Sequence, residues 1–269
     1  MDQAEILEEF EEKGYAVVPD ALSEDEVRYL NHTLDRLHED DPDAFYEATD
    51  GVLYTSKPFH DHPEKIDQYI RNEGLLPLFR QILGDDLRFA NWSLREVLPE
   101  ATADCDLEMH RDIGYYAKEM NGRLWDPENP YTSVISGAIV YLTDVDPCCP
   151  CFCIVPDSHE YENATQARAE MAEEYREHEI RASAGTAILY NITEYHCRRA
   201  GEQDCQHGRR TMHTHYAQSS SPPMSDRITL PESLARSSST ETRQFYSLWS
   251  PAQIEYAKET YDDPPNYYL

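Results

Sequence analysis

The residues best suited to chemistry lie in the segment Met109–Ile113, where His110 and Asp112 stand two positions apart. In an extended strand, side chains at positions i and i+2 point to the same face, so this pair can hold one metal ion from one strand. A third ligand from a distant strand, taken here as His196, completes a set of two imidazoles and one carboxylate. Such a set leaves coordination positions open on the metal, which is the ligand pattern of non-haem Fe(II) oxygenases.

The His-x-Asp spacing is a weak signal when it is taken alone. The chain has 11 histidines and many aspartates, so a pair of this kind is expected by chance about once. A second triplet, His38-Glu39-Asp40, falls where the flanking residues predict a helix, and a helix would place the two side chains on different faces. The prediction for His110 therefore depends on the elements that surround it.

Composition excludes several classes of partner. The 269-residue chain has 23 basic and 52 acidic residues and a formal net charge of −29. Nucleic acid and anionic membranes both require a basic face, which this chain lacks. Residues 1–13 are acidic, unlike a signal peptide, and no apolar stretch approaches the length of a membrane span. We therefore expect a cytoplasmic protein, monomeric or homodimeric, that acts on a small molecule.

Regions of different character follow one another along the chain. Residues 1–86 predict helices, residues 87–217 predict short strands broken by Gly, Pro and Asp, and residues 218–269 form a C-terminal extension of what we expect to be a single domain. The strand-rich part is typical of an antiparallel barrel or jelly roll. The predicted helices are 2–13, 23–38, 63–72, 75–83, 165–178 and 251–261. The predicted strands are 15–18, 87–98, 107–113, 134–143, 152–155, 186–190 and 210–216.

The order of these features resembles the phytanoyl-CoA dioxygenase family. Four stretches carry the resemblance: a Gly-Tyr-Ala-Val-Val strand before a capped helix, the His-x-Asp, a strand–turn–strand ending in Val-Pro-Asp-Ser-His, and closing strands with a distal His and an Arg. They occupy residues 10–27, 109–112, 138–159 and 185–216. The chain departs from the family pattern at Asp157, where the family usually has Gly, and at Cys197-Arg198, where Gly or Ser is common.

The resemblance implies a mainly β fold with flanking helices, in which an N-terminal helical layer precedes a double-stranded β-helix core (a cupin-like jelly roll). It also implies Fe(II), 2-oxoglutarate and O2, with His110, Asp112 and His196 as the catalytic metal ligands. Arg209 would anchor the distal carboxylate of 2-oxoglutarate, with Arg210 as the close alternative. Halogenating relatives leave the position of the Asp112 carboxylate to chloride, so the resemblance favours hydroxylation or desaturation.

An arginine suits the anchoring role because its planar fork binds a carboxylate through two hydrogen bonds and stays charged. The alternative for Arg209 is a surface residue that neutralises nearby acids. His213 and His215 share a face with Arg209 by strand parity, so both are expected to point into the barrel. We expect these two histidines to pack or to line the substrate site, and they are the alternatives to His196 as the distal ligand.

Further side chains are candidates for contact with the substrate. Alternate positions on the strand before His110 place polar side chains on one face, and aromatic residues follow the metal-binding segment, where a lid or a substrate wall would lie. Ordinary core and rim packing is the alternative for the aromatic residues. The candidates are Asn91, Ser93, Arg95, Tyr115, Tyr116, Trp125 and Arg198.

The expected activity is hydroxylation of a small, non-CoA metabolite, coupled to decarboxylation of 2-oxoglutarate to succinate. Coenzyme A carries phosphates and would require a basic rim, whereas the chain has five lysines and many of its arginines stand beside acids. Electrostatic steering favours neutral or cationic molecules, although Arg95 or Arg198 could hold one carboxylate of a zwitterion. The alternatives are a cupin-like metal dioxygenase that does not use 2-oxoglutarate and a non-catalytic binding protein of the same fold.

Seven cysteines are present, and four of them, Cys148, Cys149, Cys151 and Cys153, form one cluster. A structural zinc site would require a second cysteine pair at a distance, and the sequence has none. The resemblance to the phytanoyl-CoA dioxygenase family places the cluster in a turn that leads into a buried strand, where a free cysteine behaves as a small hydrophobic residue. We therefore expect these four thiols to be reduced and free of metal.

Overall fold

The computed structural model describes residues 2–47, 51–99, 108–112, 135–202, 207–218 and 230–246. The chain forms two compact units. The first comprises Met1–Thr55, Ser93–Ser133 and Gly137–His213, and the second comprises Ser56–Trp92, Val134–Ser136 and Thr214–Leu269. All three candidate metal ligands belong to the first unit. The expectation of a single domain stays a prediction.

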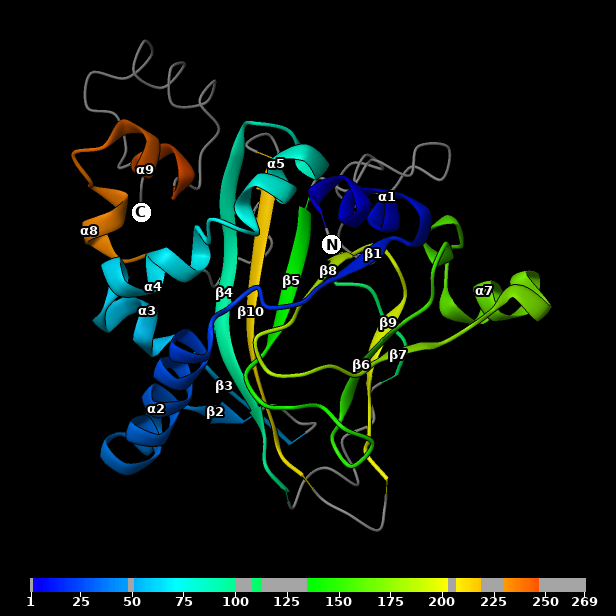
Figure 1. The fold of residues 1–269 in the computed structure, drawn as a ribbon, viewed down its shortest axis with the longest axis horizontal. Coiled ribbons are helices and arrows are strands. Elements are labelled where there is room, and N and C mark those ends of the chain that lie inside the picture. The colour runs from blue at the N-terminus through cyan, green and yellow to red at the C-terminus, as the bar shows by residue number, and fades with distance from the viewer. Residues whose placement is uncertain are drawn as a thin grey trace. The chain divides into compact units, whose positions relative to one another are not determined.

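The strands are β1 Tyr15–Val18, β2 Tyr46–Glu47, β3 Val52–Thr55, β4 Leu87–Val97, β5 Ile135–Tyr141, β6 Cys151–Ile154, β7 His178–Ile180, β8 Ala187–Asn191, β9 His196–Arg199 and β10 Arg209–Gln218. They form a larger sheet with the order β1-β8-β5-β10-β4-β3-β2 and a smaller sheet with the order β7-β6-β9 (Figure 1). From β5 onward the chain passes repeatedly between the two sheets. This mostly antiparallel arrangement confirms the predicted cupin-like jelly roll with flanking helices.

Side chains from the two sheets meet in the interior of the first unit. Phe152 of β6 packs against Tyr190 of β8 with 5.0 Å between ring centroids. The Tyr141 hydroxyl of β5 donates to the Ile180 carbonyl of β7 at 2.7 Å and accepts from the Phe152 N–H at 3.1 Å. Every residue of β5 and β8 is buried, so both faces of these strands are covered.

Two N-terminal helices of the first unit begin at capping boxes. Helix α1 (Gln3–Lys13) is capped by Asp2 and ends at Gly14, which adopts the left-handed φ of 71°. Helix α2 (Glu24–Asp40) is capped by Ser23 with Glu26, as the sequence predicts. The short 3-10 helix η1 (Pro42–Ala44) follows α2. Both capped helices bury one apolar face, so local sequence signals and packing agree here.

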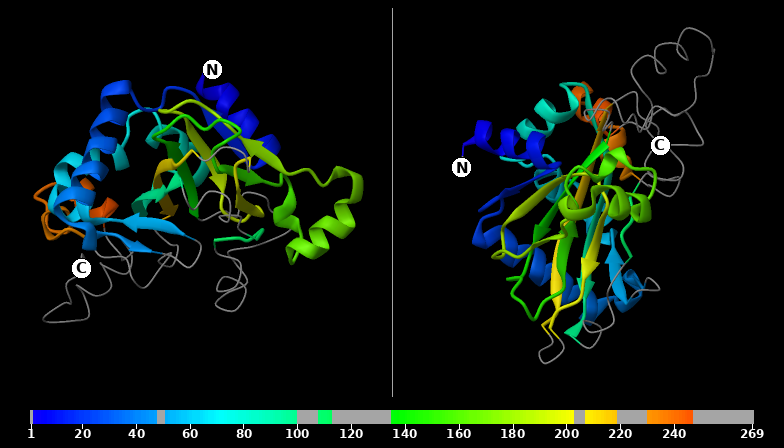
Figure 2. Two further views of the ribbon diagram at one scale, coloured as in Figure 1. Left: turned by 90° about the horizontal axis from the view of Figure 1, so that it is seen from below. Right: turned by 90° about the vertical axis from the view of Figure 1, so that its right-hand side faces the viewer.

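Helix α7 (Ala164–Met171) extends away from the smaller sheet (Figures 1 and 2). The prediction of a helix up to His178 is wrong. Ala172 takes a positive φ of 49°, a 3-10 turn η4 (Ala172–Glu174) follows, and residues from His178 onward pair with β6. Sheet pairing therefore overrides the helical composition of this segment.

The second unit contains α3 Lys57–Asp61, α4 Pro63–Ile70, α5 Leu76–Leu83, α8 Glu232–Ala235 and α9 Thr240–Phe245. Its core is aromatic: the Phe59 ring lies 5.3 Å from that of Phe89 and 5.9 Å from that of Tyr246. The Tyr246 hydroxyl donates to Asp67, and the Tyr216 hydroxyl donates to the Ile70 carbonyl. Helices α8 and α9 lie within the region predicted as a C-terminal extension.

Within the described ranges, no helix combines the length and the apolar character that crossing a bilayer requires. The helix predicted at 251–261 lies outside the described residues.

Candidate metal centre

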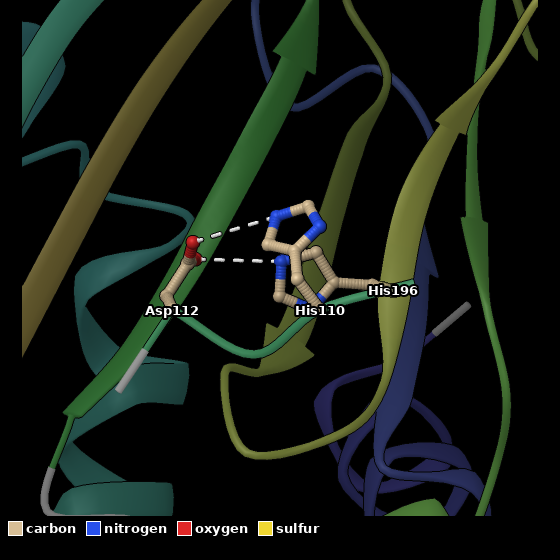
Figure 3. A group of neighbouring side chains, drawn as sticks. All are labelled: His110, Asp112 and His196. Atoms are coloured by element: carbon tan, nitrogen blue, oxygen red, sulfur yellow. Dashed lines mark ion pairs between the residues drawn. The ribbon is translucent and has the colours of Figure 1, made fainter. Parts of the chain in front are cut away.

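The three candidate ligands converge in the first unit. The ligand atoms of His110, Asp112 and His196 all lie within 4.8 Å of one another. The Asp112 carboxylate lies 4.0 Å from His110 Nε2 and 3.5 Å from His196 Nε2, and both imidazoles point toward it (Figure 3). Ligand atoms bound at about 2.0–2.2 Å to one ion lie about 3–4 Å apart, so this spacing fits a single transition metal.

The segment that carries His110 is not the strand that the sequence predicts. His110 and His196 exchange two main-chain hydrogen bonds of 3.0 Å, which form an isolated antiparallel bridge. The chain then bends at Asp112, and the described residues 108–112 form no strand. The expectation of strand parity is therefore wrong, and a bend brings the carboxylate to the imidazoles.

The Arg111 side chain is bound to the turn that follows β6. Its guanidinium donates to the carbonyls of Ser158 at 2.8 Å and His159 at 3.1 Å, and also to that of Tyr161. It lies 4.1 Å above the Tyr195 ring. These contacts hold the residue between the two ligands against the turn that follows β6.

The tautomers of both histidines suit metal binding. His110 Nδ1 lies 2.8 Å from the Glu108 carbonyl, and His196 Nδ1 lies 2.9 Å from the Glu194 carbonyl. A carbonyl accepts only, so Nδ1 carries the proton and Nε2 is left as a lone-pair donor. Burial and the neighbouring His196 lower the pKa of His110, which favours the neutral imidazole that a metal requires.

A tyrosine fixes the carboxylate. The Tyr190 hydroxyl donates to Asp112 Oδ2 at 3.0 Å. Burial raises the pKa of Tyr190 well above its ordinary value, and the nearby Asp112 adds to this shift. Tyr190 therefore stays protonated and remains a hydrogen-bond donor to this carboxylate.

A fully buried carboxylate, Glu194, lies behind His196. Its oxygens lie 2.9 Å from both the Ser158 hydroxyl and the His159 N–H, and 2.5 Å from His159 Nδ1. Ser158 Oγ also accepts from the Tyr195 N–H at 2.7 Å. A Cβ at Gly14 would lie 2.5 Å from Glu194 Oε1, so a glycine is required there.

We name Arg111, Ser158, His159 and Glu194 the polar clamp. Through the turn that follows β6, these four residues connect the segment of His110 and Asp112 to the segment of His196. The sequence patterns described above assign a role to neither His159 nor Glu194. Asp157, which precedes the turn, adopts a left-handed φ of 59°. This explains why the family usually has Gly at that position, and Asp is among the residues that tolerate it.

A cavity of about 320 Å³ opens onto the candidate ligands. Arg209 is buried, lines this cavity and donates from Nη1 to the Pro150 carbonyl at 3.2 Å. Arg210 does not line it, because its side chain forms ion pairs of 2.7 Å with Glu96 and with Asp35. The cavity thus contains one of the two predicted anchoring arginines.

The predicted substrate residues divide into three groups. Arg95 and Arg198 line the cavity, whereas Asn91 and Ser93 are not among its lining residues. Of the two histidines on β10, His213 lines the cavity and His215 is buried elsewhere on the strand. The candidates Tyr115, Tyr116 and Trp125 lie outside the described residues.

The cysteine cluster differs from expectation at one position. Cys149, Cys151 and Cys153 are buried free thiols, as is Cys197. Burial raises the pKa of Cys151 to about 12, so its thiol stays protonated. Cys148 is disulfide-bonded, so the prediction that it is reduced is wrong. Its half-buried position in a turn leaves it accessible, unlike the thiols on the strand.

A second group of possible metal ligands lies in the loops that precede β6 and β10. It consists of Asp146, Cys149 and His207. Asp146 accepts from the Cys148 N–H at 2.8 Å and lies 3.0 Å from His207 Nδ1. The Cys149 thiol donates to the Asp144 carbonyl at 3.3 Å. These three side chains therefore already have hydrogen-bond partners within the protein.

A jelly roll with two histidines and one carboxylate facing a cavity defines the class of cupin-like metal-dependent oxygenases. The chain belongs to the phytanoyl-CoA dioxygenase family, whose model matches residues 10–210. The family uses Fe(II), 2-oxoglutarate and O2, and the chain is accordingly an Fe(II)/2-oxoglutarate-dependent oxygenase. No curated protein matches the sequence significantly.

Solved structures share the fold at low sequence identity. EctD from S. alaskensis, with 2-oxoglutarate and 5-hydroxyectoine, is 18% identical with a TM-score of 0.63 over 85% of this chain and 81% of that one. HygX from Streptomyces hygroscopicus, with nickel and 2-oxoglutarate, is 19% identical with a TM-score of 0.60 over 80% and 87%. The carbocyclase SnoK from nogalamycin biosynthesis is 19% identical with a TM-score of 0.61 over 80% and 83%.

Proposed function

We propose that this oxygenase binds Fe(II) through His110, Asp112 and His196 and hydroxylates a small, non-CoA organic substrate as 2-oxoglutarate is decarboxylated to succinate. The observation that carries the proposal is the convergence of two imidazole Nε2 atoms and one carboxylate on a cavity that also contains Arg209. The donor set fits the metal, because both histidines are held as Nδ1–H tautomers.

Bound Fe(II) supplies the site at which O2 is reduced while 2-oxoglutarate is decarboxylated. The protein's own groups orient the reactants. Tyr190 holds Asp112 by a hydrogen bond to Oδ2, which leaves Oδ1 for the metal. The polar clamp holds the main chain beside the ligands, and the three ligand side chains line the cavity.

Arg209 is the proposed anchor for the distal carboxylate of 2-oxoglutarate. It is buried and charged, and a buried carboxylate is held best by a bidentate guanidinium. Arg210 instead forms ion pairs with Glu96 of β4 and Asp35 of α2, and so links this helix to the sheet.

A small substrate fits the cavity better than an acyl-CoA does. Its volume of about 320 Å³ is near the lower end of the range for small-molecule sites, and 2-oxoglutarate takes part of it. EctD and HygX were solved with 5-hydroxyectoine and with hygromycin B, respectively, which are small molecules without coenzyme A. Hydroxylation is favoured over halogenation because Asp112 supplies a carboxylate ligand.

The test is anaerobic titration of the purified protein with Fe(II) and then with 2-oxoglutarate. A metal-to-ligand charge-transfer band should appear on addition of 2-oxoglutarate. In Arg209→Ala the affinity for 2-oxoglutarate should fall about 10–100-fold, the value expected for loss of a charge-assisted hydrogen bond. The matched variant Arg210→Ala should keep the wild-type affinity.

Other outcomes favour the alternatives. Iron binding without the band would favour a cupin-like dioxygenase that does not use 2-oxoglutarate. A band without 2-oxoglutarate decarboxylation across a broad substrate screen would favour a binding protein. Decarboxylation stimulated by acyl-CoAs alone would contradict the small, non-CoA substrate.

A further inference from the structure

Three side chains form one row across neighbouring strands at the mouth of the cavity. Tyr46 of β2 stands directly opposite Tyr54 of β3, and Tyr54 stands directly opposite Arg95 of β4. Directly opposed residues in antiparallel strands project from the same face. All three line the cavity, and we name them the mouth row.

The row runs from solvent toward the metal ligands. Tyr46 is 65% exposed, whereas Tyr54 and Arg95 are half-buried. The two tyrosine rings are stacked with 5.2 Å between centroids, and the Arg95 guanidinium lies 4.7 Å from the Tyr54 centroid. At its inner end, Arg95 lines the same cavity as His110 and Tyr190.

Arg95 places a guanidinium on the wall of the cavity. Its Nε donates to the Ser93 hydroxyl at 3.2 Å, and no carboxylate of the described residues pairs with it. By contrast, Arg71, Arg199 and Arg210 each form an ion pair with an acidic side chain. A half-buried, unneutralised guanidinium facing a cavity is suited to bind an anion.

The exposed aromatic end of the row also suggests a ligand. Tyr46 is the one large hydrophobic residue that is strongly exposed among the described residues. Burying its face against a substrate would remove apolar surface from water, and a second aromatic ring adds stacking. A flat or apolar body can therefore lie along Tyr54 and Tyr46 while an anionic end reaches Arg95.

We propose that the substrate is a small organic anion whose carboxylate or phosphate binds Arg95 and whose apolar body lies against Tyr54 and Tyr46. The proposal rests on the proposed function, because it assigns Arg209 to 2-oxoglutarate and Arg95 to the substrate. The acidic surface does not oppose it at short range: salt screens exposed charges beyond about 8–10 Å at physiological ionic strength, whereas Arg95 acts at contact.

The test uses four probes that share a phenyl ring and carry an anionic, neutral or cationic polar group: phenylacetate, phenyl phosphate, phenylacetamide and phenethylamine. Calorimetric titration, without O2, measures the binding of each probe to protein already saturated with Fe(II) and 2-oxoglutarate. Saturation keeps the anions from occupying the site at Arg209. At least one of the two anions should bind about 10-fold or more tightly than the amide and the amine, and comparison of the two anions identifies the preferred group.

The variant Arg95→Gln should lose this preference and keep its affinity for 2-oxoglutarate, which the charge-transfer band reports. The control Arg28→Gln, which removes an exposed arginine on α2, should keep the preference. Equal or tighter binding of the amide or the amine by the wild type would overturn the proposal. So would an anion preference that persists in Arg95→Gln, or a loss of 2-oxoglutarate affinity in that variant.

Failure of the proposed function gives a different result. A wild-type protein that forms no charge-transfer band would contradict use of 2-oxoglutarate, but calorimetry still measures the anion preference. Loss of that preference in Arg95→Gln would then support the anion site alone.

Discussion

The polar clamp and the mouth row both adjoin the three candidate ligands and are built differently. In the clamp, Glu194 is fully buried, and Arg111 and Ser158 form bonds to the main chain. The mouth row consists of side chains that touch through ring and guanidinium faces, and its outer member is 65% exposed. The clamp is specified by hydrogen-bond geometry, whereas the row is specified only by strand register.

This difference separates two tasks. A metal centre needs ligands fixed within a fraction of an ångström, which buried and fully bonded neighbours provide. Substrate recognition tolerates adjustment, and exposed aromatic faces allow it. Substitutions in the clamp should therefore alter metal binding and stability together, whereas substitutions in the mouth row should alter recognition alone.

The largest effect is expected at the ligands that the clamp positions. His110→Ala, Asp112→Ala and His196→Ala should each lose tight Fe(II) binding and reduce turnover by at least about 1,000-fold, because ligands of one metal act as a unit. Iron content and the charge-transfer band measure this loss. His207→Ala, which changes an exposed histidine, is the control. Stoichiometric iron in His196→Ala would mean that His213 or His215 is the distal ligand.

Glu194→Gln should have the next largest effect. The side-chain amide of Gln has only one acceptor oxygen, so it cannot accept all the hydrogen bonds that the buried carboxylate receives from Ser158 and His159. The free energy of unfolding should fall by about 1–3 kcal/mol, and Fe(II) affinity should fall about 10–100-fold, as for other groups that orient metal ligands. Urea unfolding and competitive iron chelation measure the two quantities. Glu160→Gln, an exposed carboxylate in the same turn, should change neither. A stability loss with unchanged iron affinity would show that the clamp does not position the metal.

The sequence indicated the candidate ligands but not the clamp. His110 and Asp112 are visible because their types and spacing are local. The burial of Glu194 depends on its close approach to Gly14, which is distant in the chain. The bend at Asp112 depends on carbonyls of a turn after β6 that no local pattern links to Arg111.

The mouth row was hidden for another reason. Strands β2 and β3 are short, and neither was predicted, so the register that aligns Tyr46 and Tyr54 with Arg95 was not available. The alternate positions on β4 pointed to Arg95, which lines the cavity. They also suggested Asn91, which does not line the cavity. Parity identifies a face, but only the neighbouring strands decide how much of that face borders the cavity.

The clamp should also give stability a distinct pH dependence. Burial acts to lower the pKa of His159, but the hydrogen bond and the charge of Glu194 outweigh it and leave the pKa raised from 6.5. The protonated pair therefore stabilises the fold fully below pH 6.5, and this contribution is lost as pH rises through the raised pKa. Urea unfolding of the wild type and of His159→Gln across this range isolates the effect. A constant difference between the two proteins would mean that His159 does not titrate there.

The smallest effect is expected at the outer end of the mouth row. Tyr46 stacks on Tyr54 and is largely exposed, so its removal leaves no buried polar group and no cavity. An aromatic pair contributes about 0.5–1.5 kcal/mol, so Tyr46→Ala should raise KM about 2–10-fold. Because the ring does not touch the reacting atoms, kcat and the melting temperature should stay unchanged. Tyr46→Phe keeps the ring and should behave as the wild type does. If Tyr46→Ala instead lowered kcat or iron affinity, the mouth row and the metal centre would be coupled, and the separation between recognition and metal binding would not hold.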